Sequence, residues 1–390
     1  MGLVPETMPV NPGTRYRRPL HIGGAILLAG LLAILCINST LHRLQQAGSP
    51  VGGEGRGAAI GAIRAEDYAR AGALAQVALR RAPLDQRLLG IWGTAELARA
   101  REPEAQTIFG VAGALGWRDR ATQRYWAFAA LQLRDFPVAA QRTDALLRLD
   151  GPRQHAALVR ELEAMPAGRT ALAQRLLLSP PWGVSWIAQP KGDAPARAAV
   201  IERAVRGGYA APPAAGGLVR RLFEGGRVAD AQRLWGVLEK GQSGTMLPNG
   251  FGYPTTWIKS PFTWTLTVNG NVDARIEGTG MEAELIVVSV AATRQTAATH
   301  GMALAPGHYA LEWNVVAEPD ANRPMEVTVR CVVENADLIR DAEPKILGTR
   351  RRQEFTVPPG CAGQWIAFRV PAASGSSEHR ISRPQIVPIR

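Results

Sequence analysis

Residues 85–149 read DQRLLGIWGTAELARAREPEAQTIFGVAGALGWRDRATQRYWAFAALQLRDFPVAAQRTDALLRL. A shift of 34 residues brings similar residues into register, which indicates an internal repeat. The pairs that coincide are Trp92 and Trp126, Ala95 and Ala129, Leu97 and Leu131, Pro103 and Pro137, Ala105 and Ala139, and Leu115 and Leu149. Apolar residues recur at helical spacing in both halves of each unit. The pattern therefore predicts amphipathic helices over residues 85–100, 103–115, 119–134 and 137–149.

The repeat resembles the tetratricopeptide repeat (TPR) family over residues 63–152. Its units pair two helices in 34 residues, with an aromatic in the first helix, small residues in both, and a proline near the boundary, here Pro83 and Pro152. The chain departs from the family pattern around Ala95 and Ala129, where Ala-Glu and Ala-Ala replace Gly-Tyr. The resemblance implies a helical solenoid with a concave face for protein partners. We expect Trp92 and Trp126 to pack within their repeats.

Helical periodicity extends on both sides of this repeat. It predicts further helices over residues 68–82, 153–165, 171–178, 196–206, 214–223 and 228–239, with Ser179-Pro180-Pro181 as an interruption. The sequence thus predicts an all-α, TPR-like domain over residues 63–240. A turn-rich linker follows at residues 241–260.

Beyond this linker the apolar period changes from 3.6 to 2, which is typical of strands. Strands are predicted at 262–266, 272–276, 282–290, 299–304, 308–316, 325–333, 353–357, 364–370 and 381–388. Many short strands without an intervening helix predict an all-β antiparallel sandwich over residues 261–390. The opening aromatic strand, the turn at residues 304–307 and the last strand give this part a resemblance to the jelly-roll folds of carbohydrate-binding modules.

The N-terminal part contains LHIGGAILLAGLLAILCI at residues 20–37, which is long enough for a helix to cross a hydrocarbon core of roughly 30 Å. Arg15, Arg17 and Arg18 precede it, and Arg43 follows it, so the charge bias places the N-terminus in the cytoplasm. We expect a cytoplasmic tail at 1–19, an uncleaved transmembrane signal anchor at 20–38 and a Gly-rich linker at 39–62. The alternatives are a cleaved signal peptide and a buried soluble helix.

Composition favours a bacterial chain with globular domains. The net charge is +12 and hydrophobic residues make up 46%, with many arginines but only Lys191, Lys240, Lys259 and Lys345 as lysines. The basic residues are spread along the chain and form no basic-aromatic motif, which argues against nucleic acid as a partner. With the anchor, this predicts a single-pass inner-membrane protein whose bulk is periplasmic.

The cysteines agree with that compartment. Cys331 and Cys361 both fall in the strand region, and in an oxidising compartment such a pair predicts a disulfide. A metal site is disfavoured because no second Cys or His stands at ligand spacing.

Strand alternation predicts a polar face. Tyr309, Leu311 and Trp313 share one side of their strand, which therefore faces the core. The opposite face would carry the candidate glycan-binding residues Glu312, Asn314, Arg330, Trp365 and Arg369. Sugar rings stack on aromatic faces, and charged side chains bond their hydroxyls. The alternative is that Trp365 packs under a loop or on the helical domain and that the polar residues are plain surface.

The sequence predicts a binding protein and not an enzyme, because it contains no motif of the hydrolase, P-loop, zincin or dinucleotide-binding types. No cofactor or metal is expected. The helices would bind a protein partner and the strands a glycan or protein, in export or assembly of envelope polysaccharide. Two alternatives stay open. One is a glycan-active enzyme that uses two of Glu282, Glu284, Glu312 and Glu326, and the other is an adaptor that binds only proteins in a secretion complex.

Overall fold

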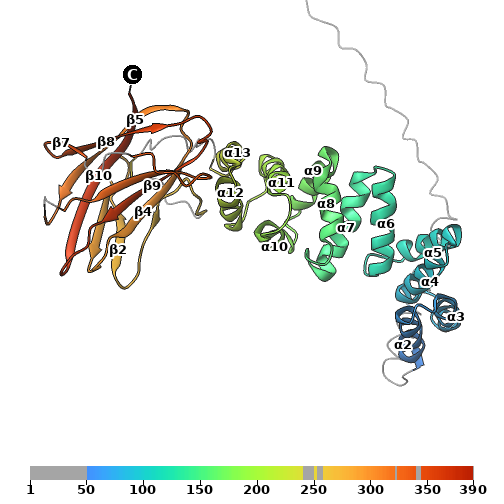
Figure 1. Ribbon diagram of the computed structural model, residues 1–390. Coiled ribbons are helices and arrows are strands. Elements are labelled where there is room, and N and C mark those ends of the chain that lie inside the picture. The colour runs from blue at the N-terminus through green and yellow to red at the C-terminus, as the bar shows by residue number, and fades with distance from the viewer. Residues whose placement is uncertain (1–50, 240–249, 253–257, 321–322, 340–343, 390) are drawn as a thin grey trace, which may run out of the picture. The chain divides into compact units, whose positions relative to one another are not determined.

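A computed structural model describes residues 51–239, 250–252, 258–320, 323–339 and 344–389. Helices come first along the chain and antiparallel strands follow (Figure 1). The chain divides into two compact units, with the boundary in the sequence between Thr122 and Gln123. Within the described part, no helix has both the length and the apolar character needed to span a membrane. The predicted anchor at 20–38 lies outside the described residues, as do the tail at 1–19 and the linker up to residue 50.

The first unit contains α2 (Val51–Arg64), α3 (Tyr68–Leu79), α4 (Gln86–Ala98), α5 (Glu102–Ala114) and the beginning of α6 (Arg120–Gln132). Two of these helices begin at aspartates that accept backbone hydrogen bonds. Asp67 Oδ1 accepts from Arg70 N at 3.0 Å, and Asp85 Oδ1 accepts from Arg87 N at 2.9 Å. Between the helices lie fully buried alanines, namely Ala71, Ala75, Ala95, Ala105 and Ala112, whose small side chains let the helices approach closely.

Helix α2 corrects the prediction of a Gly-rich linker over residues 39–62, because the chain is helical from Val51. The glycines make this helix intrinsically unfavourable, by about 1 kcal/mol each relative to alanine. Packing outweighs that preference, since Ala59 is fully buried and Ala62 is 8% exposed. At Gly55 the backbone lies so near α3 that an added Cβ would stand 3.3 Å from Ala78.

The second unit continues with α7 (Phe136–Asp150), α8 (Ala156–Ala164), α9 (Pro166–Leu176), α10 (Gly183–Ala188), α11 (Ala194–Arg206), α12 (Ala214–Glu224) and α13 (Val228–Leu238). Helix α10 follows the predicted interruption at residues 179–181, in a stretch where the sequence predicts no helix. Its Trp186 is buried, as is the preceding Trp182. The Trp182 indole donates to Asp144 at 2.7 Å and the Trp186 indole donates to Glu163 at 3.1 Å, so both buried N–H groups are satisfied.

The strands form two antiparallel sheets. Their bounds are β1 Thr265–Leu266, β2 Val272–Glu277, β3 Glu284–Ser289, β4 Gln295–Met302, β5 Gly307–Ala317, β6 Glu326–Cys331, β7 Lys345–Leu347, β8 Arg350–Val357, β9 Gln364–Val370 and β10 Ser377–Pro388. The four-stranded sheet has the order β1-β4-β9-β6, and the six-stranded sheet has the order β2-β3-β10-β5-β8-β7. Both sheets contribute to one apolar core, so the region is sandwich-like. All nine predicted strands are present, and β7 is additional.

Two features close this core. The Cys331–Cys361 disulfide is confirmed, with Cα atoms 5.5 Å apart, and it joins the end of β6 to the segment before β9. Phe251, from the predicted linker 241–260, is buried in the same core against Phe368, at 5.7 Å between ring centroids. The Trp264 indole donates to Gly250 O at 3.0 Å, so residues 250–252 of this linker belong to the sandwich, whereas Ile258 is buried in the core of the helical region.

Helix α12 packs on the four-stranded sheet. Its Phe223 lies 5.3 Å from Phe262 and 5.0 Å from Trp365 between ring centroids. Glycine permits this approach on the sheet side, because a Cβ at Gly301 would stand 2.9 Å from the Phe223 ring and one at Gly363 would stand 2.7 Å from Val228. The helices and the sheet therefore share an interface with little room for larger side chains.

Candidate functional site

The five predicted glycan-face residues do not share one sheet. Glu312 and Asn314 lie on β5 of the six-stranded sheet, whereas Arg330 lies on β6 and Trp365 and Arg369 lie on β9 of the four-stranded sheet. Alternation along a strand tells which residues point away from the core, but two sheets point away from it in opposite directions. The structure thus brings together Glu312 and Asn314 and separates them from the other three.

Trp365 is covered by the helical region. Its ring meets Phe223 edge to face, and the guanidinium of Arg220 lies 5.6 Å from the ring centroid. This is the alternative arrangement, in which the tryptophan packs on the helices. Arg330 is engaged in an ion pair with Asp337 at 3.3 Å. Arg369 stands opposite Glu326 in the ladder between β9 and β6.

Glu312 and Asn314 instead line a cavity of about 330 Å³ on the six-stranded sheet. The lining comes from β5, β8, β10 and the segment before β3, and consists of Met281, Glu282, Glu312, Trp313, Asn314, Arg350, Arg383 and Gln385. The ladder explains this grouping. Asn314 pairs with Arg350 on β8, and Glu312 pairs with Gln385 on β10, so strands distant in sequence present these side chains side by side.

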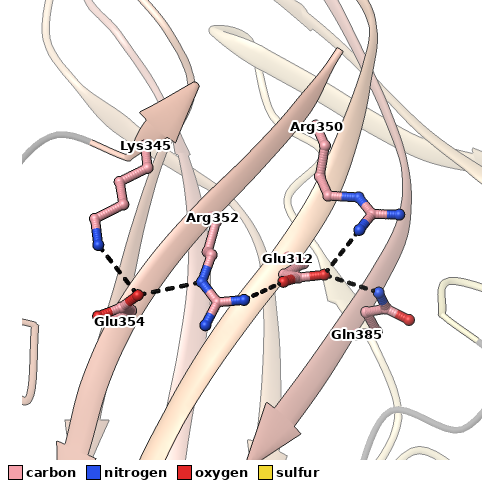
Figure 2. A network of polar contacts seen from close by, with 6 residues as sticks. All are labelled: Glu312, Lys345, Arg350, Arg352, Glu354 and Gln385. Carbon is pink, nitrogen blue, oxygen red and sulfur yellow. Dashed lines mark hydrogen bonds and ion pairs between the residues drawn. The ribbon is translucent and has the colours of Figure 1, made fainter. Parts of the chain in front are cut away.

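Glu312 is the centre of the polar network in Figure 2. The residue is only 6% exposed, and its carboxylate accepts from Arg352 at 2.7 Å, from Gln385 at 3.1 Å and from Arg350 at 3.4 Å. Burial of a carboxylate is tolerated only when it is paired and hydrogen-bonded, as it is here. Glu312 therefore holds Arg350 and Gln385 in place beside the cavity.

The network extends toward the edge of the sheet through Arg352. Its Nε donates to Glu354 at 3.2 Å, and Glu354 also accepts from Lys345 at 3.2 Å (Figure 2). The bond to Glu354 raises the pKa of Arg352, and the bond from Lys345 lowers the pKa of Glu354. Arg352 and Glu354 therefore stay charged near neutral pH.

The lining of the cavity also contains an ion pair between Arg383 of β10 and Glu282. The cavity thus presents guanidinium and amide donors together with carboxylate and amide acceptors. Such a set matches hydroxyl-bearing ligands, and guanidinium groups also match carboxylates and phosphates. The Trp313 ring is 2% exposed, so the cavity has little aromatic surface on which a sugar could stack.

Sequence reasoning missed Arg350, Arg383 and Gln385. The predicted strand at 353–357 begins three residues after the observed start of β8, which left Arg350 outside it. In β10 the register shifts between Ser382 and Gln385, so strict alternation does not predict on which face Gln385 lies. The run Arg350-Arg351-Arg352 was a usable signal, because every second residue of a strand shares a face.

The carboxylates proposed for glycan cleavage are partly brought together. Glu282 and Glu312 line the same cavity. Glu284 lies on β3, and Glu326 lies on β6, where it pairs with Arg294. Among the described residues, no group of three or more His, Cys, Asp and Glu side chains is arranged to hold a metal ion.

No known protein family matches this chain. A search of curated proteins gives no match either. Among solved structures, one match is the crystal structure of the enzymatically active domain of tailspike protein 4 from bacteriophage CBA120. The identity is 15%, the match covers 32% of this chain and 19% of that one, and the TM-score is 0.23. A score this low defines no common fold, so the cavity has to be interpreted from its own chemistry.

Proposed function

We propose that this protein is a membrane-anchored periplasmic scaffold whose strand region binds a glycan and whose helices bind a protein partner. The observation that carries the glycan half is the cavity on the six-stranded sheet, which Asn314, Arg350 and Arg383 line together with the buried Glu312. Its volume of about 330 Å³ is at the lower end of ligand sites, which suits a short stretch of a polysaccharide.

The resemblances of the helices to TPR units and of the strands to a jelly roll would agree with the same role. A TPR-like arrangement of the helix pairs would provide an extended surface for a protein partner. A jelly-roll arrangement of the strands is common to many lectin domains. The anchor at residues 20–37 would hold both parts at the periplasmic face of the inner membrane, where envelope polysaccharides are exported or assembled.

Glycan retention tests the first half of this proposal. Full-length protein in detergent is passed over immobilised bacterial polysaccharides, and retained protein is quantified. We expect retention by at least one polysaccharide, with a loss of about tenfold in Asn314→Ala and Arg350→Ala, because each loses a donor at the cavity. Retention by none of them, or equal retention of these variants, would overturn the glycan half.

Arg330→Ala is the matched control. Arg330 is an exposed arginine in an ion pair, like Arg350, but it lies on the four-stranded sheet outside the cavity. We expect its retention to equal that of the wild type. A loss of retention in Arg330→Ala alone would instead assign glycan binding to the face of the four-stranded sheet that carries Arg330.

A glycan-active enzyme is the second candidate, favoured by Glu282 and Glu312 on one cavity. Hydrolysis needs two carboxyl groups about 5–10 Å apart, one acting as acid and the other as base or nucleophile. The test is release of reducing ends from a retained polysaccharide. If the protein is an enzyme, Glu282→Gln will abolish release and leave retention intact, whereas no release by the wild type leaves binding as the function.

A further inference from the structure

The first unit contains a cavity that the proposed glycan site does not use. It has a volume of about 450 Å³ and lies between α2, α4 and the segment that leads into α6. Its apolar lining is formed by Ile60, Ile63, Gly90, Ile91 and Ala121. Its rim carries arginines from three different segments, namely Arg56, Arg64, Arg87, Arg118 and Arg120.

The acidic group inside this cavity is already satisfied. Asp119 is 7% exposed and accepts from Thr122 N at 2.8 Å and from Thr122 Oγ1 at 2.6 Å. Gly90 makes room for it, because a Cβ there would stand 2.2 Å from the Asp119 carboxylate. Asp119 therefore belongs to the wall of the cavity, and Thr122 meets its need for donors.

The rim is left with excess positive charge. Arg56 is 4.0 Å from Asp85, a separation at the limit of an ion pair. In the part of the chain that the structure describes, the side chains of Arg64 and Arg118 have no ion-pair partner. Both are exposed, so they can turn toward a ligand in the cavity. Ile60, 37% exposed, adds an apolar surface beside them.

We infer that this cavity binds an acidic segment of a partner protein, with an apolar side chain on Ile60, Ile63 and Ile91 and flanking carboxylates on Arg64 and Arg118. The inference rests on the proposed role of the helices in binding a protein partner and names the chemistry of that partner. Arginine pairs with carboxylates through two parallel hydrogen bonds, so the rim selects acidic residues as well as attracting them. Positive charge around a concave surface also raises the rate of encounter with an acidic segment.

The test uses full-length protein in detergent and a fluorescein-labelled peptide of sequence Glu-Leu-Glu-Glu-Leu-Glu, with binding measured by fluorescence anisotropy. We expect saturable binding that weakens with added salt. The double variant Arg64→Ala/Arg118→Ala should weaken it by about tenfold, since two exposed ion pairs are lost. Ile60→Ser should weaken it separately, and Leu-to-Ser replacement in the peptide should have the same effect.

The matched control is Arg80→Ala/Arg81→Ala, which removes two exposed arginines that do not line the cavity. Its affinity should equal that of the wild type. No binding, equal binding of Arg64→Ala/Arg118→Ala, or equal binding of a peptide with Gln in place of Glu would overturn the inference. So would preferential capture by vesicles of anionic lipid that the same double variant abolishes, because the occupant would then be a membrane. Glycan retention of the Arg64→Ala/Arg118→Ala variant, measured in parallel, separates a failure here from a failure of the glycan proposal.

Discussion

His300 is a buried histidine on β4 whose ring lies 4.9 Å from that of Trp264. Burial disfavours the charged form and lowers the pKa of His300 to about 4, although backbone hydrogen bonds act in the opposite direction. In the unfolded chain the pKa returns to about 6.5. Between about pH 4 and pH 6.5 the unfolded state therefore binds more protons at His300 than the folded state does. Stability is complete above about pH 6.5 and falls as the pH drops toward 4, by up to about 3 kcal/mol.

Urea unfolding of the wild type and of His300→Phe at a series of pH values checks this prediction. The variant should lose less stability on acidification, because the aromatic ring is kept and the titrating group is removed. Part of the acid-induced loss of stability should remain in the variant, since burial lowers the pKa of His379 as well. Parallel acid profiles for the two proteins would contradict the role of His300.

Gly90 is predicted to tolerate no side chain. In Gly90→Ala the new Cβ would overlap Asp119, and moving that carboxylate breaks its two hydrogen bonds with Thr122. We expect a loss of about 1–3 kcal/mol in unfolding free energy. The matched control is Gly110→Ala in α5, where a Cβ meets nothing within 4 Å. It should stabilise its helix by about 1 kcal/mol, and a neutral Gly90→Ala would contradict the packing described here.

Among the elements, α2 shows most clearly that a segment can be helical although its glycines have a low intrinsic helix propensity. Gly57 and Gly61 lie within this helix, and a Cβ at either position would meet nothing within 4 Å. Gly57→Ala/Gly61→Ala should therefore stabilise α2 by about 0.5–1 kcal/mol per substitution. Slower amide hydrogen exchange over residues 51–64 would be the expected measurement. Exchange at the rate of an unstructured chain in both proteins would show that the segment is a tether, as its composition predicts.

Long periodic elements could be predicted from the sequence, and short ones could not. The helical region and the antiparallel strands are confirmed, because they depend on local pattern, and the Cys331–Cys361 disulfide is confirmed as well. Helix α10 has six residues and β7 has three, too few to show a period. Trp182 and Trp186 make α10 stable through buried hydrogen bonds to Asp144 and Glu163, contacts distant in sequence.

The candidate site shows what alternation along a strand can predict and what it cannot. Alternation correctly separates Glu312 from the core residues Leu311 and Trp313. It gives no information on which sheet a strand joins or what covers that sheet. Trp365 and Glu312 therefore share a predicted face but lie on different sheets. The partners of Glu312 come from β8 and β10, and only the pairing of the strands brings them together.

At the scale of the whole molecule, the periplasmic location proposed above would suit the disulfide. Disulfides persist in oxidising surroundings and are rare in the cytosol. The Cys331–Cys361 bond is thus compatible with a periplasmic location for the strand region. An anchor at residues 20–37 with a cytoplasmic N-terminus would place everything after it on that side.

The predicted anchor can be tested by placing two charged residues within its apolar stretch. Leu27→Arg/Leu31→Arg puts arginines near the middle of the stretch, where each costs about 2.5–3.5 kcal/mol on insertion. The wild type should stay in the membrane pellet through an alkaline wash, and the variant should move to the soluble fraction. Val77→Arg/Leu133→Arg is the control, because Val77 in α3 and Leu133 in the turn after α6 are 55% and 81% exposed, and the substitutions should leave pelleting unchanged. Release of the wild type by the wash would contradict an anchor, and it would leave the glycan and peptide sites to be explained on a protein free of the membrane.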